Sequence, residues 1–380
     1  MTKQLGIVFA VVFVDLLGFG IVLPLLPTYA TLFHVSPTAI GFLVTSFSLL
    51  QLVAVPLWGS LSDRFGRRPV LIVGLVGSTV SYVLFALAGS YWVLLVSRIV
   101  AGAMGATVGV AQAYIADVTP PERRAHAMGV LGAAFAMGFI LGPALGGALS
   151  AHSYSSAGVV AAALCAANAL GAAAWLPETP RRGATPAGRD RLRAMAAPLA
   201  ASFLLTAAFA VIHVTLPLFG RDVWGDSTRR MGMLFAYMGV VSAAVQGGLV
   251  GRLASRVGEE RLAAAGAALL ALGLALVPGA TARWSLYAAL GLLSAGSALA
   301  TPSVYAVVSR RASAAQQGAA LGVTQTASTL GRIVGPTLAG FLIGASGLRA
   351  PFWAGAVLGL LGMGAALMLA RGRRAAPAAL

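Results

Sequence analysis

The sequence predicts an all-α polytopic membrane protein, with twelve transmembrane helices in two pseudo-symmetric six-helix bundles. Of its 380 residues, 59% are hydrophobic and 9% are charged, and the mean hydropathy is +0.89. Soluble domains carry about 25% charged residues. Twelve apolar runs approach the ~20 residues that a membrane-spanning helix needs, and two motifs recur in the second half of the chain. These three observations exclude an ordinary soluble domain.

The apolar runs divide six and six around one long polar stretch. The first six are 5–29, 38–58, 70–90, 92–116, 127–150 and 157–176, and the second six are 198–219, 230–250, 261–280, 284–308, 319–344 and 351–370. We expect the first run to be retained as a span, because it is too long for the apolar core of a signal peptide. The expected domains are an N-terminal six-helix bundle (1–176), a cytosolic linker (177–197) and a C-terminal six-helix bundle with a short basic tail (198–380).

The positions of the basic residues predict the topology. A formal net charge of +16 would suggest nucleic-acid binding in a soluble protein. With a cytosolic N-terminus, however, 19 of the 26 Lys and Arg residues lie on the cytosolic side and five on the other, while Arg98 and Arg332 lie inside spans. This asymmetry indicates a multi-pass protein of a bacterial-type inner (plasma) membrane, with both termini cytosolic.

The same features set the expected partners. We expect a small-molecule substrate, protons and the lipid bilayer as partners, no nucleic acid, and a chain that functions as a monomer. Cys165 is the single cysteine, which excludes disulfide frameworks and cysteine-based metal sites. No cofactor and no metal site are expected.

Two pairs of motifs indicate an internal repeat. "GSLSDRFGRRP" starts at Gly59 and "GRLASRVGEER" at Gly251, an offset of 192 residues. "GFILGPALGG" starts at Gly138 and "GRIVGPTLAG" at Gly331, an offset of 193 residues. Repeated halves in a polytopic chain indicate a transporter built from two bundles around a site at the membrane midplane.

Through these motifs the chain resembles the major facilitator superfamily over essentially its whole length. "GSLSDRFGRRP" matches the superfamily's loop signature between spans 2 and 3. "SRIVAGAMGA" resembles its span 4 motif, "GFILGPALGG" the antiporter motif of span 5, and "LPET" the end of span 6 in drug:proton antiporters. "DLLGFGIVLPLLP" and "AYIADVTPPERRA" resemble tetracycline-type efflux carriers. The resemblance implies the major facilitator fold and a twelve-span drug:proton antiporter.

The chain departs from the tetracycline carriers at two positions. Those carriers also have an aspartate in span 3 and an acid in span 9. Here Ser81 occupies the span 3 position, and residues 261–280 contain no acid. Metal–tetracycline recognition is therefore not part of what the resemblance implies.

The strongest candidate site residues are the ionisable groups inside spans. Asp15 lies about 15 Å into span 1 at 1.5 Å per residue. Burial favours the neutral form of a carboxyl group, so Asp15 is a candidate for binding the coupled proton; a structural ion pair is the alternative. Arg98 starts a small and polar stripe that ends at Gln112. It is the second candidate for proton coupling, or a fixed structural cation.

The loop signature suggests a gate. Gly59 and Gly66 are expected to form a tight turn, and Asp63 to cap a helix or to pair with arginine. The arginines of the loop would reach acids such as Asp117 and Glu122 in one conformational state only, or would simply hold the loop inside. The predicted gating residues are Gly59, Asp63, Arg64, Gly66, Arg67, Arg68, Pro69 and Asp117.

The span 5 motif suggests close helix packing. Small residues four apart allow two membrane helices to approach, and a proline inside the span permits a bend. In the antiporters that the chain resembles, this element helps to seal the cavity, although simple packing would explain the glycines. The residues are Gly138, Gly142, Pro143, Gly146 and Gly147.

Other polar and aromatic side chains are candidates for lining a substrate cavity. For Arg332, substrate contact and structural pairing are equal alternatives, and for His213 and the aromatic residues plain packing is an alternative. The candidates are Phe19, Gln51, Gln112, Phe135, His213, Tyr237, Gln246, Tyr305, Gln325 and Arg332.

Together these features predict a secondary active transporter that exports drug-like or amphiphilic small molecules in exchange for protons, by alternating access. An exporter of a sugar or another metabolite on the same fold is the alternative. A membrane enzyme is disfavoured because no convergent catalytic group is present, and a non-transporting receptor because the halves are paired. The chain has no Walker-type phosphate loop, so direct ATP drive is not expected.

Overall fold

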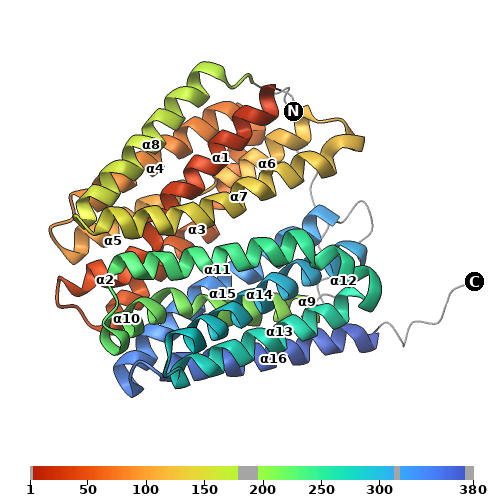
Figure 1. Cartoon of the computed structure of the whole chain (residues 1–380). Coiled ribbons are helices and arrows are strands. Elements are labelled where there is room, and N and C mark those ends of the chain that lie inside the picture. The colour runs from red at the N-terminus through yellow and green to blue at the C-terminus, as the bar shows by residue number, and fades with distance from the viewer. Residues whose placement is uncertain (1–2, 179–195, 312–316, 373–380) are drawn as a thin grey trace, which may run out of the picture. The chain divides into compact units, whose positions relative to one another are not determined.

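A computed structural model describes residues 3–178, 196–311 and 317–372, and these contain no strand. The helices up to residue 178 are α1 (Lys3–Val22), η1 (Leu23–Leu25), α2 (Leu26–Thr31), α3 (Pro37–Phe65), α4 (Arg67–Ala86), α5 (Tyr91–Met104), α6 (Thr107–Val118), α7 (Pro121–Ser150) and α8 (Tyr154–Trp175). The later helices are α9 (Ala196–Ala210), α10 (Ile212–Trp224), α11 (Thr228–Gly248), α12 (Val250–Val257), α13 (Glu259–Leu276), η3 (Val277–Gly279), α14 (Arg283–Arg311), α15 (Gln317–Ser346) and α16 (Ala350–Gly372) (Figure 1).

The helices coincide with the expected spans. Within the described ranges, 11 helical segments are long and apolar enough to cross a membrane. The eleventh expected run falls on α15, which is 30 residues long but is not among those segments. Every expected run overlaps a helical segment, so the all-α polytopic fold class is confirmed.

Three spans are built from more than one helix. Span 1 passes through the 3₁₀ turn η1 between α1 and α2, and span 7 is divided between α9 and α10. Span 4 is interrupted at Gly105 and Ala106, between α5 and α6. The expected continuous stripe from Arg98 to Gln112 is therefore wrong, because the two residues lie on separate helices. Glycine is a poor helix former, and span 4 has glycines at 102, 105 and 109.

The chain divides into two compact units. Unit 1 comprises residues 1–185 and 216–236, and unit 2 comprises residues 186–215 and 237–380. In unit 1, α1 packs against α7 and α8, and α4 packs against α5 and α8. In unit 2, α13 packs against α14 and α16, and α9 packs against α15 and α16. The division at 177–197 stays a prediction, and residues 179–195 of that linker lie outside the described residues.

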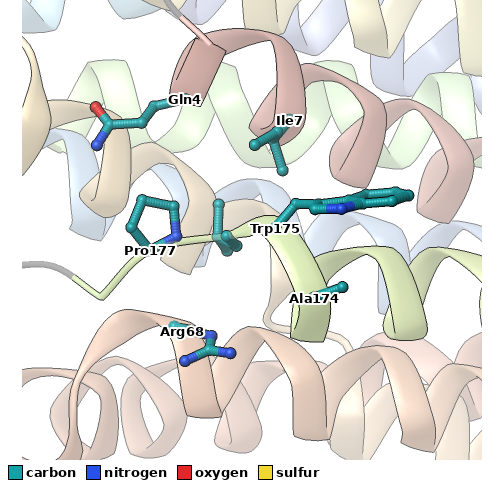
Figure 2. A pocket seen from close by; sticks show the side chains of 7 residues that line it. Gln4, Ile7, Arg68, Ala174, Trp175 and Pro177 are labelled. Atoms are coloured by element: carbon teal, nitrogen blue, oxygen red, sulfur yellow. The ribbon is translucent and has the colours of Figure 1, made fainter.

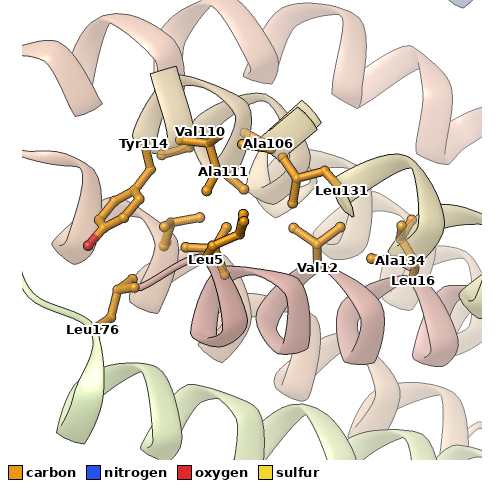
Figure 3. Packing of buried hydrophobic residues seen from close by; sticks show 14 of the residues in the cluster. Leu5, Val12, Leu16, Ala106, Val110, Ala111, Tyr114, Leu131, Ala134 and Leu176 are labelled. Carbon is orange, nitrogen blue, oxygen red and sulfur yellow. The ribbon is translucent and has the colours of Figure 1, made fainter. Parts of the chain in front are cut away.

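An apolar cluster joins α1, α6 and α7 within unit 1. Val12 and Leu16 of α1 face Val110 of α6 and Leu131 of α7, and all four are buried (Figure 3). This packing fixes the rotation of α1 about its axis, and with it the direction in which the one acidic residue of α1 projects.

Candidate functional site

Asp15 is the acidic side chain in the middle of α1. Its neighbours Val12 and Leu16 are buried, whereas Asp15 is only half-buried. Its Oδ1 accepts a hydrogen bond from Ser78 Oγ of α4, at 3.1 Å. No Lys or Arg of the described residues forms an ion pair with it. A carboxyl group held by a hydroxyl can gain or lose a proton without breaking an ion pair.

Arg98 of α5 lies inside unit 1, 1% exposed. Its Nε donates to Ser97 Oγ at 3.2 Å. Its guanidinium carbon lies 5.9 Å from the ring centre of Tyr82 and 5.8 Å from that of Phe85, within the range of a cation–π contact. In the described part of the chain, no carboxylate forms an ion pair with this guanidinium, so Asp15 and Arg98 are not joined directly.

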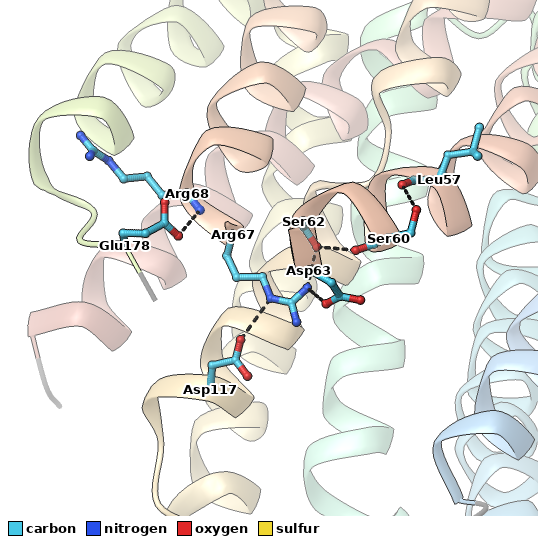
Figure 4. Close-up of polar contacts among 9 residues, drawn as sticks. Leu57, Ser60, Ser62, Asp63, Arg67, Arg68, Asp117 and Glu178 are labelled. Carbon is cyan, nitrogen blue, oxygen red and sulfur yellow. Dashed lines mark hydrogen bonds and ion pairs between the residues drawn. The ribbon is translucent and has the colours of Figure 1, made fainter. Parts of the chain in front are cut away.

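The loop signature forms an ion-pair network around Arg67 (Figure 4). Arg67 Nη1 lies 2.6 Å from Asp63 Oδ1, and Arg67 Nε lies 3.1 Å from Asp117 Oδ2 at the end of α6. The Arg67 and Asp117 side chains are each 13% exposed. Arg67 also donates to Ser62 Oγ. The network therefore ties α3, α4 and the end of α6 together.

Other residues of the signature do not follow the expectation. Gly59 lies inside α3 rather than in a turn, because α3 continues to Phe65 and α4 begins at Arg67. Gly66 alone makes the break, with φ of 106°, a backbone conformation that favours glycine. Pro69 falls in the first turn of α4, and Arg64 is exposed without an ion pair among the described residues.

Arg68 turns toward the end of α8 instead of toward Asp117. Its Nη2 donates to the carbonyl of Ala173, and its backbone N–H donates to Glu178 Oε1 at 3.3 Å (Figure 4). The Glu178 carboxylate thus caps the N-terminus of α4, where negative charge is favourable. The predicted contact of the loop arginines with Glu122 involves a side chain outside the described residues.

A cavity of about 630 Å³ opens beside Arg68 (Figure 2). Its walls come from the start of α1 and the end of α8, including Gln4, Ile7 and Trp175. None of the predicted substrate-cavity residues lines it, so it does not serve as the predicted substrate cavity.

The span 5 glycines pack α7 against α1 as closely as backbones allow. A Cβ on Gly142 would lie 2.7 Å from the Cα of Gly20, and a Cβ on Gly138 would lie 2.7 Å from Leu16 Cβ. Gly146 faces the backbone of Ile21. α7 continues through Pro143 to Ser150. The motif thus packs the helix that carries Asp15.

Gly147 faces a different helix of the same unit. A Cβ there would lie 2.9 Å from the carbonyl oxygen of Arg229 and 3.0 Å from the Cα of Gly232, both on α11. The last glycine of the motif therefore packs against α11, within residues 216–236.

The cavity candidates of unit 1 are scattered. Phe19 contacts Phe47 and Phe139, with ring centres 5.0 and 5.9 Å away, and Phe135 packs on the apolar cluster of α1, α6 and α7. Gln51 donates to the Gly105 carbonyl at 2.8 Å, whereas Gln112 is exposed. These residues pack and cap helices in the structure and do not converge on one point.

Several candidates of unit 2 do come together. Tyr305 Oη of α14 donates to Gln325 Oε1 of α15 at 2.7 Å, and lies 3.1 Å from Ser328 Oγ. Arg332 Nη2, further along α15, donates to Thr329 Oγ1 at 2.8 Å. Arg332 interacts electrostatically with Tyr305 and with His213. Unit 2 therefore contains a polar cluster of which the sequence predicted four members: His213, Tyr305, Gln325 and Arg332.

The two remaining candidates lie apart from this cluster. Tyr237 Oη donates to the Tyr287 carbonyl at 3.2 Å, and the two rings meet edge to face. Gln246 is exposed.

The polar face of α4 contains site residues that the sequence pattern alone did not indicate. Ser78 binds Asp15, Tyr82 and Phe85 contact Arg98, and Ser81 is fully buried with an Oγ that has no partner among the described residues. The signal was present, because spacings of three and four place these residues on one helical face. It could not be used, because the partner of that face depends on how α4 is rotated against α1 and α5.

Comparison with known proteins adds an independent observation. A family model described as the Major Facilitator Superfamily matches residues 8–261 and 231–379. The chain is 33% identical over 359 residues to the class C tetracycline resistance protein of Escherichia coli, covering 90% of each chain. It is 34% identical over 353 residues to the class G protein of Vibrio anguillarum, covering 88% of this chain and 89% of that one. The solved structure of the human organic anion transporter MFSD10 (TETRAN) matches with a TM-score of 0.74 and 26% identity, over 96% of this chain and 100% of that one.

Proposed function

The chain belongs to the major facilitator superfamily and is a multi-pass membrane transporter, and on that premise we propose that it exports drug-like or amphiphilic small molecules in exchange for protons. The relatives that are tetracycline resistance proteins and a "Multidrug resistance protein 2" of Bacillus subtilis, 26% identical over 379 residues, support efflux. We propose a plasma-membrane location and a monomer, with both termini cytosolic; the distribution of Lys and Arg supports the orientation of the termini.

The observation that carries the proton coupling is the environment of Asp15. Its carboxyl group lies near the middle of a membrane-spanning helix and is partly exposed, with Ser78 as a hydrogen-bond donor and no cation of the described ranges paired to it. Intramembrane carboxyl groups of this kind are default candidates for proton binding. Protonated Asp15 keeps the acceptor oxygen that Ser78 needs, so both protonation states fit the same packing.

Alternating access requires two states that protonation and substrate bias differently. The contacts of Arg67 with Asp63 and Asp117 are candidates for a latch that exists in one of those states. Loss of the proton from Asp15 adds a negative charge inside unit 1. In this proposal, the charge changes the affinity for the substrate and the stability of the latch. In this scheme proton and substrate compete for the same state of the transporter.

The test is transport by the purified protein in liposomes. An imposed pH gradient should drive uptake of at least one compound from a panel that includes ethidium and tetracycline, and an ionophore that collapses the gradient should stop it. Asp15→Asn should lower the gradient-driven rate by at least about tenfold. The matched control is Asp222→Asn, since Asp222 is an exposed acid paired with Arg221.

Two results would contradict the proposal: uptake that ignores the gradient, or Asp15→Asn transport equal to that of the unmodified protein. Gradient-driven uptake of a sugar, with none of the amphiphilic compounds transported, would favour the metabolite exporter instead.

A further inference from the structure

Arg98 presents an electrostatic problem that its ring contacts only partly solve. A guanidinium is always charged, and burying a charge without a partner is costly. Arg98 is 1% exposed, and its Nη2 has no hydrogen-bond partner among the described residues. Its cation–π contacts to Tyr82 and Phe85 replace only part of the hydration that burial removes. The guanidinium therefore retains attraction for an anion in its surroundings.

Tyr82 lies between this guanidinium and the helix that carries Asp15. On α4, Tyr82 follows Ser78 by one turn, and on α1, Gly18 follows Asp15 by one turn. Ser78 reaches Asp15, and the Tyr82 ring reaches Gly18, where a Cβ would lie 2.9 Å from Cε2 and 3.2 Å from Oη. The absence of a side chain at Gly18 leaves the space that the phenol occupies.

The Tyr82 hydroxyl can donate a hydrogen bond, and the Asp15 carboxylate can accept one. Tyr82 is 4% exposed, and within the described ranges its hydroxyl has no hydrogen-bond partner. A phenolic hydroxyl can donate one hydrogen bond, and this one is available to a nearby acceptor. Asp15 accepts a hydrogen bond from Ser78 Oγ, and the buried Thr107 hydroxyl of α6 also acts on this carboxyl group. A carboxylate accepts several hydrogen bonds, so a further donor can be accommodated. Tyr82 also interacts electrostatically with both Asp15 and Arg98.

The other elements around Asp15 offer few competing groups. α8 contributes Cys165, which is buried and interacts electrostatically with Asp15. The titratable groups of α6 are engaged elsewhere: Tyr114 Oη donates to the Pro177 carbonyl and Asp117 pairs with Arg67. The α7 segment 127–150 and η1 contain no titratable residue. Among the described residues, the titratable groups that interact electrostatically with Asp15 are therefore Tyr82 and Cys165, and Arg98 is linked to it only through Tyr82.

We propose that Tyr82 is a positioning residue for proton coupling: its hydroxyl donates a hydrogen bond to the Asp15 carboxylate once the proton has left, and its ring holds Arg98 close by. The proton itself passes from the carboxyl oxygen to water, and Tyr82 keeps its own. This inference rests on the proposed function only in taking Asp15 as the proton-binding group. It explains together why α4 carries Ser78 and Tyr82 one turn apart and why α1 has a glycine at position 18.

The test follows Asp15 itself, without substrate. In the purified protein, the infrared carbonyl band of protonated Asp15 is identified by its loss in Asp15→Asn and is followed against pH. Tyr82→Phe keeps the ring and removes the hydroxyl, so the carboxylate loses a donor. The titration midpoint should move to higher pH by roughly one unit, because a hydrogen bond to a charged group has about that strength. Gly18→Ala, whose added Cβ displaces the phenol, should move it in the same direction.

Tyr114→Phe is the control for loss of a buried hydroxyl, since Tyr114 is also buried and binds the Pro177 carbonyl. Its midpoint should equal that of the unmodified protein. An unchanged midpoint in Tyr82→Phe would overturn the inference and leave Tyr82 as a packing residue. A shift in Tyr82→Phe together with proton-independent transport would overturn the proposed function and the role of Tyr82 in coupling, and would leave only the hydrogen bond from Tyr82 to Asp15 standing.

Discussion

The repeated loop signature has the same backbone design in both units but opposite charges. In unit 1, α3 and α4 are separated by Gly66, and in unit 2, α12 and α13 are separated by Gly258; both glycines have positive φ, 106° and 83°. The residue after the glycine is Arg67 in unit 1 and Glu259 in unit 2. Arg67 pairs with Asp117 at the end of α6, and Glu259 pairs with Arg310 in the last turn of α14.

This inversion shows that each loop is held by a different balance of forces. The N-terminus of a helix favours acids, so Glu259 and Glu260 suit the start of α13 without help, and Glu260 also lies 3.8 Å from Arg310. Arg67 is unfavourably placed at the start of α4 and depends on Asp63 and Asp117, while Glu178 caps the same helix start through the N–H of Arg68. The unit 1 network therefore has to offset an unfavourable charge at a helix start, which suits a contact that can be released.

The largest expected effect comes from removing Arg67. Arg67→Ala leaves two acids beside each other, of which Asp117 is 13% exposed, and should lower the stability by about 2–3 kcal/mol. The melting temperature of the purified protein and its transport rate should both fall. Arg310→Ala, in the corresponding pair of unit 2, should cost less than about 1 kcal/mol, because Arg310 is 49% exposed.

The control is Arg64→Ala, an exposed arginine in the last turn of α3, which should melt as the unmodified protein does. Equal losses of stability in Arg67→Ala and Arg310→Ala would contradict the contrast between the two units.

A charge swap should recover part of that loss, although Asp63 then lies beside a glutamate instead of its arginine partner. Arg67→Glu combined with Asp117→Arg gives unit 1 the polarity of the Glu259–Arg310 pair, and a glutamate at the start of α4 is favourable to the helix. The double variant should melt above either single variant, with a coupling of about 1–2 kcal/mol in a double-mutant cycle. Additive losses would mean that the pair contributes no interaction of its own.

The smallest effect concerns the two glycines. Both Gly66→Ala and Gly258→Ala place a side chain in the left-handed region, at a cost of about 1–2 kcal/mol. At Gly66 the new Cβ would also lie 2.7 Å from the Glu178 carboxylate, whereas at Gly258 it would lie 3.7 Å from Glu260. Gly66→Ala should therefore melt lower than Gly258→Ala, and the difference should disappear in a Glu178→Ala background. A difference that persists there would exclude Glu178 as its cause.

The sequence predicted the parts of the molecule that depend on composition and local pattern. The twelve apolar runs predicted the helices because a span must satisfy its own backbone hydrogen bonds. The pairing of Arg67 with Asp117 was also among its predictions. The predicted turn at Gly59 is wrong. The polar residues after Gly59 suggest a loop, whereas α3 continues as a helix to Phe65. Ser78 and Tyr82 were missed because their partners are set by helix rotation, which no local pattern specifies.

The central claim is that Asp15 binds the proton that is exchanged for substrate. It is tested most directly by adding the compound transported in the liposome assay to purified protein in weakly buffered solution and recording the pH. The account predicts proton release from the unmodified protein and from Asp222→Asn, and none from Asp15→Asn. Equal proton release from Asp15→Asn would contradict it.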